Sequence, residues 1–126
     1  MRTKAAHSEL SPEALQLVAE RFRLLAEPLR LRILQILRGG EKNVTELTAQ
    51  LLTTQPNASK HLRLLQDGGL IGRRQAGTSV YYFVTDPSVF ELCDVVCTSL
   101  YARMSAQARV LEQSSPGPSL RRRRGR

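Results

Sequence analysis

The only two cysteines of the chain stand four residues apart, at Cys93 and Cys97. On a helix, side chains at positions i and i+4 have Cβ atoms about 5–6 Å apart. A disulfide needs a Cβ separation of about 3.5–4.5 Å, so a bond between these two would strain or fray the helix. Metal–sulfur bonds of about 2.3 Å let two sulfurs hold one ion more easily. The pair therefore predicts a site for As(III), Sb(III) or another thiophilic ion, with a third ligand from solvent or from a partner chain.

Other interpretations of the cysteine pair stay open. The thiols could sense oxidants or persulfides, or they could be small apolar side chains packed in an interface. A Zn²⁺ site would need two more ligands, and no nearby histidine supplies them. A thiol oxidoreductase is disfavoured, because the spacing is C-x-x-x-C and no βαβ pattern surrounds it.

A second set of polar side chains lies in the segment 54–71. Thr54 followed by Pro56 is typical of a helix N-terminus, and Gly68-Gly69 ends the helix. The leucines of this helix are expected to contact the body of the protein; they are Leu62, Leu64 and Leu65.

The rest of this helix offers amide, hydroxyl and basic groups, which suit the base edges and phosphates of a DNA major groove. These residues are Gln55, Asn57, Ser59, Lys60, His61 and Arg63, and with Thr54 we predict them to contact double-stranded DNA. For His61 two roles stay open, since a neutral histidine could orient the turn or bond a phosphate. Taken alone, the pattern would equally describe the solvated face of an amphipathic helix.

The residues after this helix predict a β-hairpin, or wing. Segments 71–75 and 80–84 are strand-like, with a turn at 76–78 between them. Arg73 and Arg74 are predicted DNA contacts of the wing. Because side chains alternate along a strand, the two should face opposite sides, so that one alone reaches the DNA backbone.

Three further helices should support these elements. Ser11-Pro12 and Glu27-Pro28 each predict a helix start, and the capping-box variant beginning at Asn43 predicts a third helix through about Leu52. The helix after Glu27 is apolar on most sides, so we expect it at the buried centre. The third helix and the helix from Gln55 then form a helix-turn-helix pair.

A long last helix is predicted after Asp86-Pro87. Its apolar residues fall within one narrow arc and form a stripe; they are Val89, Cys93, Val96, Leu100, Met104 and Leu111. A chain of this size has little core for such a stripe to cover. The stripe, with the first helix, therefore predicts a homodimer contact that places two DNA-reading helices one turn of DNA apart.

Length and charge are consistent with this interpretation. At 126 residues the chain is expected to form one domain. The net charge is +8, but five of the 19 basic residues are arginines of segment 121–126; without them, 14 basic residues face 11 acidic ones. No apolar run is long enough for a membrane span, and no secretory signal is evident, so we expect a cytoplasmic protein without a membrane partner.

Residues 22–84 resemble the ArsR/SmtB family of winged helix-turn-helix repressors. The resemblance rests on the segment Phe22–Leu34, on Gln55-Pro56, Ser59, His61-Leu62 and Leu65, on Gly69-Leu70-Ile71, and on Gly77 with Tyr81. It implies a homodimer that represses promoters and leaves DNA when an ion or an oxidant binds.

The ion sites of that family do not carry over. Arsenic sensors have Cys-x-Cys at the start of the third helix, where this chain has Asn43-Val44-Thr45. Zinc sensors have Asp and His along the last helix, and here that helix contains no histidine. Cys93 and Cys97 are the remaining candidate ligands.

The sequence thus predicts a mainly α fold with a small β-hairpin, in the order α-α-α-α-β-β-α, dimerising through its first and last helices. Residues 1–10 are expected to be a flexible N-terminus, 11–113 the DNA-binding and dimerisation domain, and 114–126 a disordered basic tail. The predicted function is a homodimeric operator-binding repressor released by As(III) or Sb(III) at Cys93 and Cys97. The alternatives are a redox- or persulfide-sensing repressor and a DNA binder without an inducer. No catalytic constellation is present, so no enzyme is expected, and no cofactor is required for folding.

Overall fold

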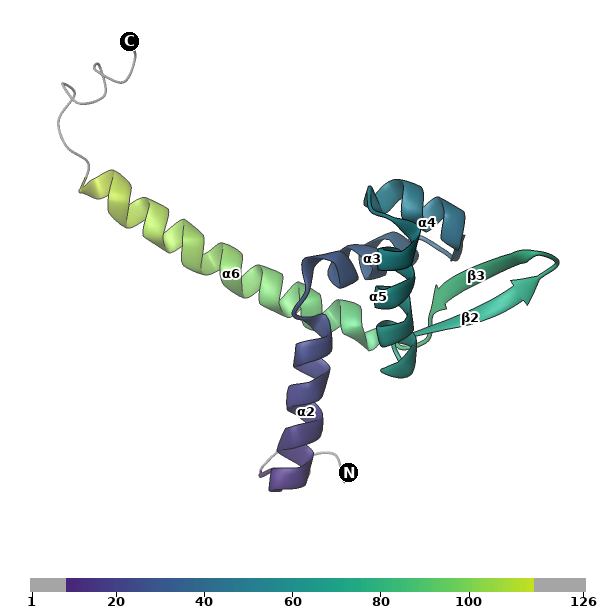
Figure 1. The fold of residues 1–126 in the computed structure, drawn as a ribbon. Helices are drawn as coiled ribbons and strands as arrows, with labels where there is room; N and C mark the ends of the chain where they lie inside the picture. Colours follow the sequence, from purple (N-terminus) through teal and green to yellow (C-terminus); the bar gives the residue numbers. More distant parts are fainter. Residues whose placement is uncertain (1–8, 115–126) are drawn as a thin grey trace, which may run out of the picture. The chain divides into compact units, whose positions relative to one another are not determined.

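The structure is a computed structural model that describes residues 9–114 (Figure 1). The chain divides into two units, with the boundary after Pro87. In the first unit the elements follow the order α2 (Pro12–Leu25), α3 (Pro28–Arg38), β1 (Lys42–Asn43), α4 (Val44–Leu51), α5 (Gln55–Asp67), β2 (Ile71–Ala76) and β3 (Ser79–Val84). The second unit is the helix α6 (Ser88–Gln113). The predicted N-terminal segment and basic tail fall outside the described residues, except for residues 9, 10 and 114.

Side-chain caps start the four helices described between residues 9 and 87 where the sequence predicts them. Ser11 Oγ accepts a hydrogen bond from the Ala14 amide (3.1 Å), and Glu27 caps α3. Asn43 and Glu46 form a reciprocal capping box, in which the Glu46 amide donates to Asn43 Oδ1 (2.8 Å) and the Asn43 amide to Glu46 Oε1 (2.9 Å). Each cap satisfies amides that the first turn of a helix leaves without a partner.

The core of the first unit is centred on α3, as predicted. Ile33, Leu34 and Leu37 are buried there. Further fully or nearly fully buried side chains of this unit come from α4, α5 and the turn into β2: Leu47, Ala58, Leu62, Leu65, Leu70 and Ile71. This packing fixes α5 against α3 and α4, and it leaves the opposite face of α5 to solvent.

The sheet has three antiparallel strands in the order β1-β3-β2, whereas the sequence predicted only the two strands of the hairpin. The additional strand is the two-residue β1, in which Lys42 pairs with Tyr82 and Asn43 with Tyr81. A strand of two residues is too short to show an alternating pattern in the sequence. The predicted hairpin itself is confirmed, with a two-residue turn at Gly77-Thr78 that extends both strands by one residue. Gly77 has φ +64°, as the first central residue of a type II′ turn requires.

The end of α5 is a Schellman motif. The Leu70 amide donates to the Leu65 carbonyl and the Gly69 amide to the Gln66 carbonyl, both at 3.0 Å. Gly69 adopts φ +80°, which a residue without Cβ tolerates. The prediction that Gly68-Gly69 ends the helix is confirmed, and the chain is turned directly into β2.

In the described part of the second unit, residues 88–114, the structure is one helix of 26 residues. Most of the predicted apolar stripe is exposed along it, including Val96, Leu100, Met104 and Leu111. Within residues 9–114 no helix is long and apolar enough to cross a membrane.

Candidate nucleic-acid interface

The start of α5 is held by its own polar side chains. Thr54 Oγ1 accepts a hydrogen bond from the Asn57 amide (3.2 Å), and Asn57 Nδ2 donates to Thr53 Oγ1 (3.0 Å). Pro56 lies in the first turn, where its missing N–H costs nothing. Thr54 and Asn57 therefore orient the N-terminus of α5, with Thr54 exposed and Asn57 half-buried.

Two faces separate along α5. Ala58, Leu62 and Leu65 are fully buried, at the spacing of one helix face. Gln55, Ser59, Lys60 and Arg63 are exposed on the other side. Leu64 was expected to contact the core, but it is 42% exposed, because its position falls between the two faces.

The expectation that His61 faces outward is wrong. Its side chain is only 7% exposed, and its Nδ1 lies 3.0 Å from Arg30 Nη1 on α3. Burial, followed by the charges of Arg30 and Lys60, lowers the pKa of His61 below its ordinary value. Its small exposure and its contact with Arg30 favour an internal role for His61 over a DNA contact.

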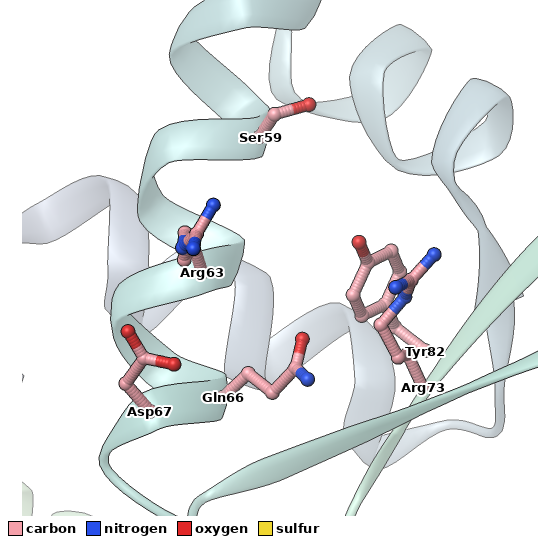
Figure 2. A pocket seen from close by; sticks show the side chains of 6 residues that line it. All are labelled: Ser59, Arg63, Gln66, Asp67, Arg73 and Tyr82. Atoms are coloured by element: carbon pink, nitrogen blue, oxygen red, sulfur yellow. The ribbon is translucent and has the colours of Figure 1, made fainter.

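An open pocket of about 400 Å³ lies between α5 and the wing (Figure 2). We call it the recognition groove, and its lining residues are Ser59, Arg63, Gln66, Asp67, Arg73 and Tyr82. Figure 2 shows the first four along one side of α5, facing Arg73 and Tyr82 on the hairpin. Its hydroxyl, amide and guanidinium groups can all donate hydrogen bonds to an anionic ligand, and Asp67 is its acidic member.

Sequence reasoning missed three residues of this groove: Gln66, Asp67 and Tyr82. Helical spacing could have indicated the first two, since they lie three and four residues after Arg63. Tyr82 could be found only with the hairpin register, which pairs it directly with Arg73.

Arg73 and Arg74 face opposite sides of the wing, as strand alternation predicts. Arg73 lines the recognition groove. Arg74 instead forms a two-pronged ion pair with Glu41, with Nη2–Oε2 and Nε–Oε1 distances of 2.6 and 3.0 Å, and its guanidinium carbon lies 4.9 Å from the centroid of the Tyr81 ring. The hydrogen bond from Arg74 lowers the pKa of Glu41, and Glu41 in turn raises the pKa of Arg74. Arg74 therefore joins the wing to the loop before β1.

The cysteines belong to the second unit. Cys93 is half-buried and Cys97 is exposed, and both are free thiols one helical turn apart on α6. Between residues 9 and 114 no group of three or more His, Cys, Asp or Glu side chains is placed to hold a metal ion. The donor set that α6 itself offers to a soft ion is thus two thiols, which fits As(III) or Sb(III) with a third ligand from elsewhere and does not complete a tetrahedral zinc site.

Sequence comparison places these elements among known regulators. Residues 25–74 match a protein family that is described as a helix-turn-helix domain. A probable mercury resistance operon repressor of Streptomyces lividans is 39% identical over 71 residues, which are 56% of this chain and 57% of that protein. The HTH-type transcriptional regulator Rv0081 of Mycobacterium tuberculosis is 32% identical over 105 residues, 82% of this chain and 92% of that one.

Structural comparison agrees. The crystal structure of Rv0081 superposes with a TM-score of 0.71 at 30% identity, covering 79% of this chain and 99% of that chain. A homodimeric winged helix-turn-helix DNA-binding domain from Mycobacterium bovis, a possible ArsR-family regulator, gives a TM-score of 0.66 at 28% identity, covering 79% and 94%. Together with the α4–α5 pair and the wing, these likenesses identify the chain as a member of the ArsR/SmtB family of winged helix-turn-helix transcriptional regulators.

Proposed function

We propose that this DNA-binding regulator is a homodimeric repressor that leaves its operator when a thiophilic ion, such as As(III) or Sb(III), binds Cys93 and Cys97. The DNA would be bound by the outer face of α5 and by Arg73 of the wing. The ion would be bound by the last helix, away in sequence from the DNA-reading residues. Separate observations support the DNA-binding, dimeric and ion-sensing parts of this proposal.

The separation of faces on α5 is the observation that carries the DNA-binding part. One face is fixed in the core by Ala58, Leu62 and Leu65, so the helix is rigidly held. The other face presents amide, hydroxyl and basic groups of Gln55, Ser59, Lys60 and Arg63 to solvent. Such groups recognise base edges and phosphates in a major groove. We therefore call α5 the recognition helix.

Exposed apolar side chains on α2 and α6 support the homodimer. On α2 they are Leu15, Leu17, Val18 and Phe22, and on α6 they include Val95, Val96, Leu100, Tyr101 and Met104. On each of the two helices, several large apolar side chains exposed to solvent favour an interaction site. The M. bovis relative is a homodimer. A two-fold dimer would present two recognition helices to successive major grooves, about 34 Å apart.

The thiol pair supports the sensory part. A thiophilic ion supplies metal–sulfur bonds that pull the two sulfurs of α6 toward one centre. Cys97 is exposed, so an ion can reach it from solvent, and half-buried Cys93 would be the second ligand. The similarity to a probable mercury resistance repressor is consistent with a soft-ion inducer. An ion bound there would act through the geometry of the dimer, which is a coupling between two sites.

The test is fluorescence anisotropy of a labelled duplex that the protein has selected from a random-sequence library. Reduced wild type is compared with Cys93→Ser, Cys97→Ser and the control Thr98→Ala, an exposed neighbour on α6. As(III) or Sb(III) should weaken the DNA affinity of wild type and of the control about 5–150-fold, the usual size of such couplings. The ions should leave the affinity of both serine variants unchanged. Wild type that stays bound throughout the ion titration contradicts the ion-sensing proposal.

The exposed thiol of Cys97 also favours a second candidate function, a repressor that senses oxidants or persulfides. Peroxide and polysulfide are therefore added to the same screen. Release by these reagents alone would identify a redox sensor. Release by none would identify a winged-helix DNA binder whose cysteines have a packing role.

A further inference from the structure

The recognition helix contains a buried histidine, His61, whose neutral tautomer is determined by its hydrogen-bond partner. His61 Nδ1 lies 3.0 Å from Arg30 Nη1, within hydrogen-bond distance. A guanidinium has five N–H donors and no acceptor, so Arg30 donates and Nδ1 accepts. The proton of the neutral imidazole is then on Nε2. His61 can keep this hydrogen bond only while it is uncharged.

Arg30 connects three helices through the same guanidinium. Besides His61 on α5, it donates from Nε to the Leu24 carbonyl (2.7 Å) and from Nη2 to the Arg23 carbonyl (3.4 Å). Both carbonyls belong to the last turn of α2, where a cation is favoured, and the Arg23 carbonyl also accepts a hydrogen bond from the Ala26 amide (3.1 Å). Arg30 itself belongs to α3. One side chain thus ties the end of α2, a helix of the proposed dimer contact, to the recognition helix.

The charges around His61 oppose its protonation. Arg30 on α3 and Lys60 on α5 itself are positive, and among the described residues the negative group that acts on the ring is Glu27, at the junction between α2 and α3. Adding a proton would place two cations about 3 Å apart at a site with little exposure to water. Burial and these charges together lower the pKa of His61. The neutral ring is therefore the form that the folded protein stabilises.

We propose that Arg30 is a positioning residue that holds the recognition helix against α2 through neutral His61, and that protonation of His61 breaks this contact and weakens operator binding. The inference rests on the proposed DNA-binding role of α5. The proposal predicts that DNA affinity falls as the pH falls. A protein that gains positive charge ordinarily binds DNA more tightly, because more phosphates can be neutralised. The predicted pH dependence is therefore opposite to that of a simple charge effect.

The first test measures operator affinity of the full-length protein from pH 8 to pH 5.5 at constant ionic strength. Coupling to one proton weakens binding by at most about tenfold per pH unit, and it acts only as the pH falls through the pKa of His61 in the DNA-free protein, which is lowered below the ordinary value of about 6.5. Wild-type affinity should therefore stay constant from pH 8 to about pH 6.5 and then fall, by no more than about tenfold at pH 5.5. Affinity that rises or stays constant as the pH falls overturns the proposal.

The matched variant is His61→Asn. The asparagine oxygen lies close to the position of Nδ1, so it can accept from Arg30, and it does not titrate. We expect near wild-type affinity at pH 8 and no acid-induced weakening of binding. A His61→Asn protein that folds but still loses affinity on acidification would show that another group is responsible, and it would overturn the proposal.

Arg30 is tested by Arg30→Met and Arg30→Lys beside the control Arg32→Met. Arg32 is exposed on the same helix, and its Nη1 donates to Gln35 and not to α5, so the control removes the same charge without the contact. We expect about tenfold weaker binding for both Arg30 variants, with a flattened pH profile, because a lysine cannot reproduce the fork. Equal losses from Arg30→Met and Arg32→Met would reduce the effect to net charge and contradict a positioning role.

A measurement without DNA separates failure of this inference from failure of the proposed function. Long-range ¹H–¹⁵N NMR spectra should show His61 as the Nε2–H tautomer at neutral pH, and backbone amides of α5 and the end of α2 should shift together as His61 titrates. An Nδ1–H tautomer, or a titration that leaves the amides of α5 unmoved, refutes the inference even if the operator is bound. The expected spectra in a protein that binds no DNA would instead refute the proposed function alone.

Discussion

Arg73 and Arg74 are adjacent in sequence, yet one lines the recognition groove opposite Tyr82 and the other is paired with Glu41 on the far side of the wing. The alternation of side chains along β2 requires this division. It gives two arginines of the same charge and nearly the same position different environments. Their contributions to DNA binding should differ accordingly.

Arg73→Ala should therefore weaken DNA binding and reduce its salt dependence, whereas Arg74→Ala should leave the salt dependence unchanged. Each phosphate contact contributes about −0.9 to the slope of log affinity against log salt. Anisotropy titrations at several salt concentrations measure this slope for wild type and both variants. Since the two substitutions remove the same charge, equal changes in slope would show that the face of the wing does not matter.

The outer face of α5 yields a second prediction. Ser59→Ala and Arg63→Ala should weaken operator binding without disturbing the core, because both side chains are exposed. Loss of a base contact should cost about 1–3 kcal/mol of binding free energy and relax sequence specificity. Loss of a phosphate contact should weaken binding about equally for all DNA sequences. Affinities for the operator and for unrelated duplex DNA are measured side by side, with gel filtration as the control for assembly. Unchanged operator affinity in both variants would remove α5 as the recognition helix.

Much of this fold could be predicted from sequence, because the decisive signals are local. Ser11, Glu27, Asn43 and Thr54 each cap a helix within their own first turn, so a short segment is enough to place the start. The apolar positions of α3 identify the core because their pattern is also contained within one short segment. The identity of the family follows from the order of these elements and their motifs.

The features that sequence reasoning missed depend on distant partners. His61 was expected outside because it is polar, but Arg30, 31 residues away in the chain, satisfies it inside the protein. The two residues of β1 become a strand only through pairing with β3. Glu41 shows no pattern in sequence, and its pairing with Arg74 spans 33 residues. Such contacts require the assembled core before they exist.

Two residues in left-handed backbone conformations should respond in opposite directions. Gly69 (φ +80°) has open space where a Cβ would be, so Gly69→Ala should lower the free energy of unfolding by about 1–2 kcal/mol through backbone strain alone. Leu52 (φ +55°) lies in the turn between α4 and α5 and is 90% exposed. Leu52→Asn should raise that free energy by about 1 kcal/mol or less, since asparagine tolerates this conformation and little packing is lost. Urea unfolding of both variants provides the test, and a destabilised Leu52→Asn protein would show that the leucine makes a contact of value.

The ion pair of Arg74 with Glu41 predicts a pH effect at the base of the wing. The hydrogen bond from Arg74, reinforced by its charge, lowers the pKa of Glu41 below the ordinary 4.5. A carboxyl group with a lowered pKa in the folded protein stabilises it above its ordinary pKa, and this stabilisation is lost as the pH falls through the lowered value. The wing should therefore stay braced at neutral pH and loosen only below about pH 4.5. In Arg74→Gln the pKa of Glu41 should return upward toward its ordinary value, whereas in Arg73→Gln it should stay low. Carboxyl ¹³C NMR titrations of Glu41 in the three proteins measure this, and an equal pKa in wild type and Arg74→Gln would show that the pair does not persist in solution.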